Sequence, residues 1–240
     1  MAISQSATSF NHLLSALPLD ALTRLLPKLC PVELPVRLPL YKQELAIEAV
    51  YFPTSGMISL VANLDDGMQA EVGIIGREGM LGTALLSGID TPFVEAMVQM
   101  PGVGLRMKAH DFRHEVDMNT PFRMLLLRYN EARYAQAMQT AACNGRHGLE
   151  QRLARWLLMA LDCIDGDVLP LTQEFMAMML GVHRPSISVT AGILQRAGLI
   201  RYAGGQITVL DRLGLEAACC ECYGVVKKRF SVLLGKSNIA

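Results

Sequence analysis

A group of cationic, hydrogen-bonding and small apolar side chains lies between positions 172 and 189. Its members are Thr172, Gln173, His183, Arg184, Ser186, Ser188 and Val189. An arginine guanidinium can donate two parallel hydrogen bonds to O6 and N7 of guanine, which is worth about 1–3 kcal/mol of discrimination between bases. Serine hydroxyls can bond to bases or phosphates, and valine can contact a thymine methyl group. These residue types therefore suit a DNA surface, provided that the chain places them on one face.

The charge around these residues differs from that of the whole chain. The formal net charge is zero, which argues neither for nor against a nucleic-acid partner. From Phe175 to Leu210, however, three arginines occur, at positions 184, 196 and 201, and no acidic residue. A local excess of positive charge is expected where a protein meets phosphates.

Glycine and proline divide this segment into two short helices. Thr172 is a suitable N-cap for the first helix, which should end at Gly181. Pro185 then lies in the first turn of a second helix that should end at Gly198. The inner stripe of that second helix should consist of Ile187, Ala191 and Leu194. Two short helices joined by a glycine turn predict a helix-turn-helix, and the strand-like residues on either side of Gly204-Gly205 predict a β wing after it.

The position of each side chain in this motif indicates its role. Residues at the start of the second helix contact base edges, which makes Arg184, Ser186, Ser188 and Val189 the candidate reading residues. Residues at helix starts suit phosphate contacts that fix the register, and these are Thr172, Gln173 and His183. The alternative is a pair of packed helices with Arg184 as a solvated surface charge. The lack of any acidic residue on the outer side of the second helix argues against it.

The first half of the chain has a strand-like pattern. After a short helix at 18–29, prolines and glycines cut residues 31–107 into short pieces, and Asp65-Asp66-Gly67 is a hairpin signal. The β-type runs between the cuts are Ala49–Phe52, Met57–Val61, Ala70–Ile75 and Glu95–Val98. Many short strands at close spacing favour an antiparallel barrel or roll.

A long helix should connect the two halves. Thr120 is a plausible N-cap, and a helix over 121–142, roughly 22 residues, would be about 33 Å long. Its small side chains fit either a buried core helix or a dimer seam in which two helices approach closely. Gly145 and Gly148 indicate a hinge before a further helix at 149–163. We therefore expect a sensor domain at 1–118, a dimerisation helix and hinge at 119–147, and a DNA-binding domain at 148–240.

The composition and the motifs exclude several classes of protein. Hydrophobic residues make up 51% and charged residues 18% of the chain, as in folded globular proteins. Apolar runs stay far below the roughly 18 residues of a membrane span, and residues 1–11 do not form a secretory signal, so we expect a cytoplasmic location. Phosphate-loop, nucleophile-elbow and HExxH patterns do not occur. Gly73-x-x-Gly76-x-x-Gly79 fits turns between strands better than a dinucleotide loop, and we predict neither an enzyme nor catalytic residues.

The cysteines do not form a disulfide framework. Of the six cysteines, three are clustered in the sequence: Cys219, Cys220 and Cys222. Adjacent cysteines on a helix point to different faces. This pattern favours ordinary buried thiols over a metal or redox site and leaves the role of the three open. The pair His110 and His114 has no carboxylate or thiol motif nearby, which favours surface side chains. We predict no metal site.

The order of these parts resembles the Crp/Fnr family of bacterial transcription regulators. The resemblance covers nearly the whole chain and is sharpest over 181–187. It implies an α+β fold with an N-terminal antiparallel β-roll, which is a double-stranded β-helix like the cyclic-nucleotide-binding domain, then a long dimerisation helix and a winged helix-turn-helix. It also implies a homodimer through helix 121–142 on palindromic double-stranded DNA, with half-sites about 34 Å apart, and contact with RNA polymerase if the protein is an activator.

The same resemblance implies that Arg184 reads guanine and that an effector binds in the roll near Gly82, Thr83 and Ala84. Pro185 stands where family members often carry an acidic residue. Cyclic-nucleotide binders of the family have a Gly-Glu pair followed by an Arg-Ser or Arg-Thr pair, whereas no Lys or Arg occurs here from 78 to 105. A buried phosphate without a cation is costly, so we do not expect cyclic AMP as the effector, which stays unknown, and we predict no cofactor.

One further comparison with the family concerns an iron–sulfur cluster. The redox branch of the family holds iron and sulfur in an N-terminal cysteine cluster, where this chain has Cys30 alone. The alternative function is that of a sensory or regulatory ligand-binding module that acts through a protein partner.

Overall fold

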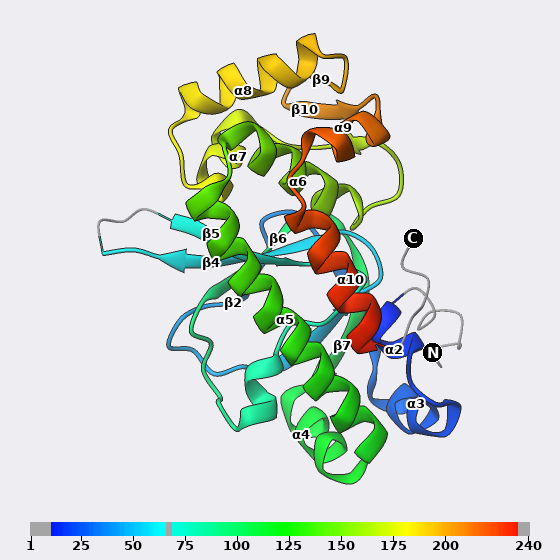
Figure 1. The fold of residues 1–240 in the computed structure, drawn as a ribbon. Helices are drawn as coiled ribbons and strands as arrows, with labels where there is room; N and C mark the ends of the chain where they lie inside the picture. Colours follow the sequence, from blue (N-terminus) through cyan, green and yellow to red (C-terminus); the bar gives the residue numbers. More distant parts are fainter. Residues whose placement is uncertain (1–10, 66–68, 235–240) are drawn as a thin grey trace.

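Two antiparallel sheets form the N-terminal part of the molecule. The computed structural model describes residues 11–65 and 69–234 (Figure 1). One sheet has the strand order β1 (Cys30–Leu34), β7 (Gly102–Lys108), β3 (Ala49–Pro53). The other has the order β2 (Pro39–Tyr41), β6 (Glu95–Met100), β4 (Met57–Asn63), β5 (Gln69–Ile75). The four runs predicted as strands are strands β3 to β6, and the antiparallel β-roll is confirmed.

Short helices and turns flank these strands. The predicted helix at 18–29 is a shorter helix, α3 (Leu19–Leu25), followed by a 3₁₀ turn, η1 (Leu26–Lys28), because Pro27 cannot continue the α-helical hydrogen bonding. The other elements of this kind, which the sequence patterns did not reveal, are α2 (His12–Ser15), η2 (Thr83–Ser87) and α4 (Ala109–Met118). The Asp66-Gly67 part of the hairpin signal lies outside the described residues.

The long helix α5 (Thr120–Arg146) is longer than predicted. Its N-cap is Asn119 rather than Thr120, because the Asn119 side chain accepts a hydrogen bond from the Phe122 backbone at 3.3 Å. The helix also continues through Gly145 to a C-cap at His147. Near its middle, Tyr129 is fully buried, and its hydroxyl accepts from Met80 N at 3.0 Å and lies 3.1 Å from Met80 O. The helix is thus fixed against the roll along one face.

Glycine at position 79 makes this close packing possible. A Cβ atom there would lie 2.1 Å from the Tyr129 hydroxyl oxygen. Gly73 and Gly76 are similarly close to side chains, those of Arg133 and Cys163. Gly73 lies inside β5, opposite Leu60, and not in a turn as the sequence pattern indicated. The glycine series therefore allows side chains from α5 and from the turn after α6 to approach the roll closely.

The C-terminal part consists of a small helical domain with a three-stranded sheet. Its elements, in chain order, are α6 (Leu149–Leu161), β8 (Val168–Leu169), α7 (Gln173–Leu180), α8 (Arg184–Arg196), β9 (Ile200–Ala203), β10 (Gln206–Val209) and α9 (Arg212–Ala218). The sheet order is β8-β10-β9. The predicted helix at 149–163 ends two residues early, at Leu161.

The last helix, α10 (Cys222–Leu234), turns back from this domain and runs beside α5 (Figure 1). Val226, Phe230 and Leu234 are buried in the same core as the apolar residues of the roll. Within residues 11–65 and 69–234, none of the helices has both the length and the apolar composition of a membrane span.

Candidate nucleic-acid interface

The predicted helix-turn-helix is present as α7 and α8. The Thr172 hydroxyl accepts a hydrogen bond from the Phe175 backbone at 3.2 Å and so caps the start of α7. Gly181 ends α7 in the left-handed conformation, with φ of 62°, which glycine adopts without strain. His183 is the N-cap residue of α8, and Pro185 lies in its first turn, where a missing N–H costs nothing.

The two faces of α8 differ in what they contact. Ile187, Ala191 and Leu194 are buried against the domain core, as predicted, and Thr190 joins them. The opposite face is open to solvent: Arg184, Ser186, Ser188 and Val189 are all exposed, Val189 to 64%. In Figure 1, α8 lies along the upper edge of the molecule with no other element over it. The four candidate reading residues therefore lie on one accessible surface.

Ser188 connects the two helices of the motif. Its hydroxyl oxygen lies 2.5 Å from Gln173 Oε1 and 3.3 Å from the Arg184 carbonyl oxygen. In either bond the hydroxyl proton points at the protein, which leaves the oxygen lone pairs as acceptors toward solvent. Ser188 can thus hold the Gln173 side chain and accept a hydrogen bond from a base at the same time.

The wing is a hairpin with a two-residue turn, as predicted. Ala203 pairs with Gln206, and Gly204 and Gly205 both have positive φ, 60° and 76°, as a type I′ turn requires. Gln195, near the end of α8, accepts a hydrogen bond from the Tyr202 backbone at 2.7 Å and so fixes the wing to the helix. The strand β8 at its other edge was not predicted.

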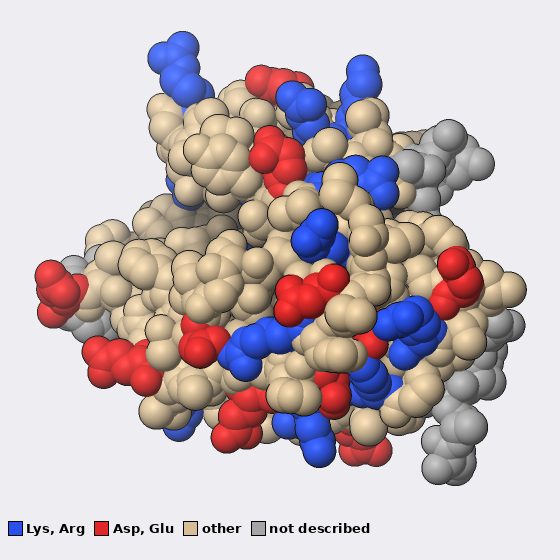
Figure 2. Space-filling model, turned by 90° about the horizontal axis from the view of Figure 1, so that it is seen from below, with Lys and Arg blue, Asp and Glu red and all other residues tan. Residues whose placement is uncertain are grey.

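Two cations that were absent from the candidate residues extend this surface. Arg196 at the end of α8 and Arg201 on β9 are both exposed. Their signal in the sequence was the run of arginines without acidic residues. By contrast, the face seen from below, away from α8, carries Lys, Arg, Asp and Glu side by side (Figure 2).

A half-buried carboxyl group connects this domain to the roll. Glu71 on β5 accepts hydrogen bonds from Trp156 Nε1 on α6 at 2.7 Å and from the Ser59 hydroxyl at 2.6 Å. Burial raises the pKa of Glu71 to about 7, although both hydrogen bonds and the nearby Arg133 oppose the rise. The contact between the two parts of the chain therefore contains a group that titrates near neutral pH.

The proposed effector residues lie inside the roll. Gly82 is buried, with φ of 117°, and Thr83 and Ala84 are half-buried in η2. A Cβ atom on Gly82 would lie 2.6 Å from both the Tyr41 hydroxyl oxygen and Val50. One cavity, of about 150 Å³, lies where the roll meets α6 and α10 and is lined among others by Arg77, Glu78 and Lys227. Another, of about 390 Å³, is lined by Tyr41 and other residues of the roll. Whether an effector binds near Gly82 stays a prediction.

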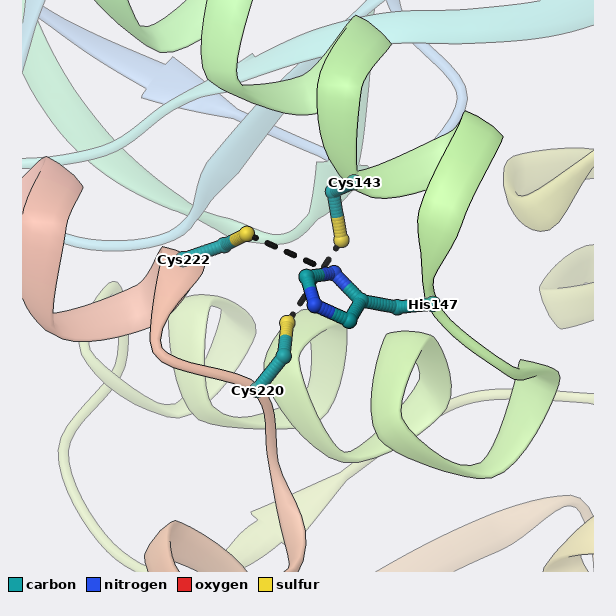
Figure 3. A group of neighbouring side chains, drawn as sticks. All are labelled: Cys143, His147, Cys220 and Cys222. Atoms are coloured by element: carbon teal, nitrogen blue, oxygen red, sulfur yellow. Dashed lines mark hydrogen bonds between the residues drawn. The ribbon is translucent and has the colours of Figure 1, made fainter.

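Four possible metal ligands meet where α5 ends and α10 begins. They are Cys143, His147, Cys220 and Cys222, and their side chains converge from two segments of the chain (Figure 3). Sequence reasoning missed this group because it considered Cys219 to Cys222 without the residues of α5. The spacing of Cys143 and His147, one helical turn apart, was the available signal. The pair His110 and His114, in contrast, is exposed, as predicted.

Comparisons with known proteins agree with this arrangement. Residues 151–218 match the family model described as the Crp-like helix-turn-helix domain. A comparison with curated protein sequences found no match.

Solved structures of Crp/Fnr regulators have the same fold. A Crp/Fnr-family transcriptional regulator from Eubacterium rectale is 17% identical, with a TM-score of 0.67 over 88% of this chain and 98% of that one. FixK2 from Bradyrhizobium japonicum is 17% identical, with a TM-score of 0.67 over 80% and 98%. The c-di-GMP-responsive regulator CLP from Xanthomonas campestris is 16% identical, with a TM-score of 0.65 over 81% and 100%. Residues 151–218 thus belong to the Crp-like helix-turn-helix domain family, on a chain whose overall fold is that of Crp/Fnr transcriptional regulators.

Proposed function

We propose that this protein is a sequence-specific transcription regulator that binds a palindromic DNA site as a homodimer. The observation that carries the proposal is the outer face of α8, where Arg184 and the serines are exposed next to a wing with a further arginine. The domain match and the fold support it, since they are those of Crp/Fnr regulators.

In this proposal, α8 enters the major groove with its N-terminal turn first. Arg184 donates to O6 and N7 of a guanine, while Ser186, Ser188 and Val189 contact neighbouring base edges. Thr172, Gln173 and His183 lie at the starts of the two helices, where backbone N–H groups favour phosphate oxygens. Arg196 and Arg201 add charge contacts to the backbone on either side.

The exposed face of α5 supports a homodimer. Met124, Leu127, Tyr134 and Met138 are 47%, 46%, 61% and 48% exposed, although they are large and apolar. Their separations of three, seven and four residues place them on one stripe with the a and d spacing of a coiled coil. A second copy of α5 with the same stripe would bury both. The two recognition helices would then face two half-sites of one DNA duplex.

Cyclic AMP is not the effector in this proposal. The lack of Lys or Arg from 78 to 105 supports this, since a cyclic phosphate needs a cation. The space beside Gly82 is also small, because a Cβ atom there would lie 2.6 Å from Tyr41 and Val50. Calorimetric titration of the full chain with cyclic AMP should give no binding heat. Saturable binding would contradict this part of the proposal.

DNA binding can be tested with fragments of the promoter region next to the protein's own gene. The full chain should shift one fragment in the presence of excess competitor DNA, and the affinity should fall steeply between 50 and 200 mM salt, as about ten phosphate contacts would require. Failure to shift any fragment, together with capture of a specific protein partner, would support the alternative of a module that acts through a partner.

The dimer can be tested by a charge on the exposed stripe of α5. Leu127→Glu should convert the dimer to a monomer in sedimentation experiments and lower DNA affinity by about 100-fold, because each half-site is then bound separately. Leu213→Glu is the matched control, because Leu213 is also exposed, to 77%, but lies on α9. A dimer that survives Leu127→Glu would exclude α5 as the seam.

A further inference from the structure

The four potential ligands at the junction of α5 and α10 have the spacing of a single metal ion's coordination shell. Their ligand atoms all lie within 4.8 Å of one another. Cys143 Sγ lies 3.5 Å from Cys220 Sγ, and Cys222 Sγ lies 3.6 Å from His147 Nδ1. Tetrahedral Zn²⁺ with Zn–S bonds of about 2.3 Å separates its sulfur ligands by about 3.8 Å. We propose that Cys143, His147, Cys220 and Cys222 bind one Zn²⁺ ion.

Local structure explains why these four side chains converge. Cys143 and His147 are four residues apart, so they lie on one face at the end of α5. Cys220 and Cys222 flank one residue at the start of α10, which packs along α5. The three cysteines are buried and form a cluster of their own, separate from the two apolar cores. The cluster is thus a distinct feature and not a part of the core packing.

Neighbouring side chains orient the ligands as in known metal sites. His147 presents Nδ1 to the thiols, while its Nε2 lies 3.4 Å from a carboxylate oxygen of Glu221. A carboxylate on the second ring nitrogen fixes the tautomer and the orientation of a metal-binding histidine. Gln139 Nε2 lies 3.0 Å from Cys222 Sγ and can donate to a thiolate there. These contacts are the kind that hold the ligands of a zinc ion in place.

The charge balance also fits a bound cation. Three thiolates around Zn²⁺ leave a net charge of −1, and binding releases the three thiol protons. Arg155, which is 5% exposed, donates to Thr140 at 3.0 Å and so holds a buried positive charge one turn before Cys143. An uncompensated buried charge would be costly, and this guanidinium offsets it.

Other uses of these thiols fit less well. A polynuclear iron–sulfur cluster places its cysteines on different iron ions, which needs wider ligand separations than those within 4.8 Å. The Cys143 and Cys220 sulfurs, 3.5 Å apart, are beyond the disulfide bond length of about 2.05 Å. Because all four ligands come from the protein, the site is closed, as in structural zinc sites.

The location gives the ion a role at the hinge. Cys143 on α5 and His147 at its C-cap precede α6, and the two ligands near α10 follow α9. The four ligands therefore bracket the domain that carries α7, α8 and the wing. Zn²⁺ would join the chain entering this domain to the chain leaving it. The angle between α8 and α5 would then depend on metal occupancy. This inference does not rest on the proposed DNA binding.

The test is the metal content and coordination of the full chain purified under reducing conditions. We expect one zinc per chain, and X-ray absorption should show three sulfur ligands at about 2.3 Å and one nitrogen at about 2.0 Å. Cys143→Ser and Cys222→Ser should each lower zinc retention against a chelator at least tenfold. Cys219→Ser and Cys30→Ser are matched controls that should keep one zinc. The Cys219 thiol donates a hydrogen bond to the Glu216 carbonyl oxygen, and Cys30 lies on β1.

Several outcomes would overturn the zinc site. The first is a chain that takes up no added Zn²⁺, and the second is bound iron with sulfide. The third is a disulfide between Cys143 and Cys220 that persists in the protein purified under reducing conditions. The fourth is zinc retention by the two ligand variants equal to that of the unmodified protein. If the ligand variants do not fold, the absorption spectrum of the unmodified protein decides alone. Because none of these measurements uses DNA, failure of the zinc site is distinguishable from failure of the proposed regulator function.

Discussion

The outer face of α8 and the interior of the roll place opposite demands on their residues. On α8, Arg184 and Ser186 are exposed and contribute little to the core. In the roll, Gly79 and Gly82 are surrounded so closely that a Cβ atom would meet neighbouring side chains at 2.1 and 2.6 Å. Substitutions on α8 should therefore change DNA recognition without loss of stability. Substitutions at these glycines of the roll should lower stability without a change in the preferred DNA sequence.

The largest effect on stability is expected for a substitution inside the roll. Gly79→Ala should lower the free energy of unfolding by about 3 kcal/mol, because the new methyl group would displace the fully buried Tyr129 and its hydrogen bonds to Met80. Urea denaturation measures this change. The control is Gly224→Ala on α10, where no atom lies within 4 Å of the added Cβ and helix propensity favours alanine. A Gly79→Ala protein as stable as the original would show that α5 can move away from the roll at little cost.

The next largest effect is expected on base preference, after substitution on the outer face of α8. Arg184→Ala should lower the preference for one base pair in each half-site by about 2 kcal/mol, or about 30-fold, and leave the urea midpoint unchanged. Binding to a set of single-base operator variants measures the preference. Arg229→Ala, which removes an exposed arginine on α10, should change neither quantity. Unchanged base preference after Arg184→Ala would remove this residue from the reading set.

A smaller effect, on the pH dependence of stability, should arise where the roll meets the helix-turn-helix domain. The pKa of Glu71 is raised to about 7 in the folded protein. Protonated Glu71 therefore contributes fully to the free energy of unfolding below the ordinary carboxyl pKa near 4.5, and this contribution is lost as the pH rises through 7. The loss should be on the order of 2 kcal/mol, because the group is partly exposed. Melting temperatures at pH 5.5 and 8 should differ less for Glu71→Gln than for the original protein. Glu48→Gln, an exposed control, should keep the full difference.

The smallest effect is expected for Ser188. Its hydroxyl lies 2.5 Å from Gln173 Oε1, so Ser188→Ala should free the Gln173 side chain and weaken DNA binding about threefold, in line with the loss of one hydrogen bond. Part of the decrease should be similar for all operator variants, since Gln173 is placed at the phosphates, and part should be confined to one base pair, since Ser188 is placed at a base edge. A decrease that is the same for every operator variant would remove Ser188 from the residues proposed to contact bases.

The helix-turn-helix domain could be predicted from the sequence because its signals are local. Gly181, Pro185 and the Gly204-Gly205 turn lie within a few residues of the elements that they end or begin. The roll was predicted less completely. Strands β1 and β2 contain Pro31 and Pro39, which looked like breaks, yet both strands lie at sheet edges, where a missing N–H is tolerated.

The metal-ligand group could not be predicted from spacing within one segment. Cys143 and His147 are separated from Cys220 and Cys222 by the whole DNA-binding domain, and only the return of α10 along α5 brings the four together. The start of α5 was misplaced for a similar reason, because Asn119 is also held by the carbonyl oxygen of Ala21, a contact between distant residues.

The return of α10 to the roll also decides how the protein can be divided for experiments. A fragment that ends at Ala218 keeps both helices of the reading motif but loses Val226, Phe230 and Leu234 from the core that surrounds Tyr129. The exposed cavity would face the apolar side of α5, and such a fragment should aggregate. The β-roll is therefore a folding unit assembled from both sides of the helix-turn-helix domain in the sequence, and separate production of it requires a short linker between α5 and α10 in place of that domain.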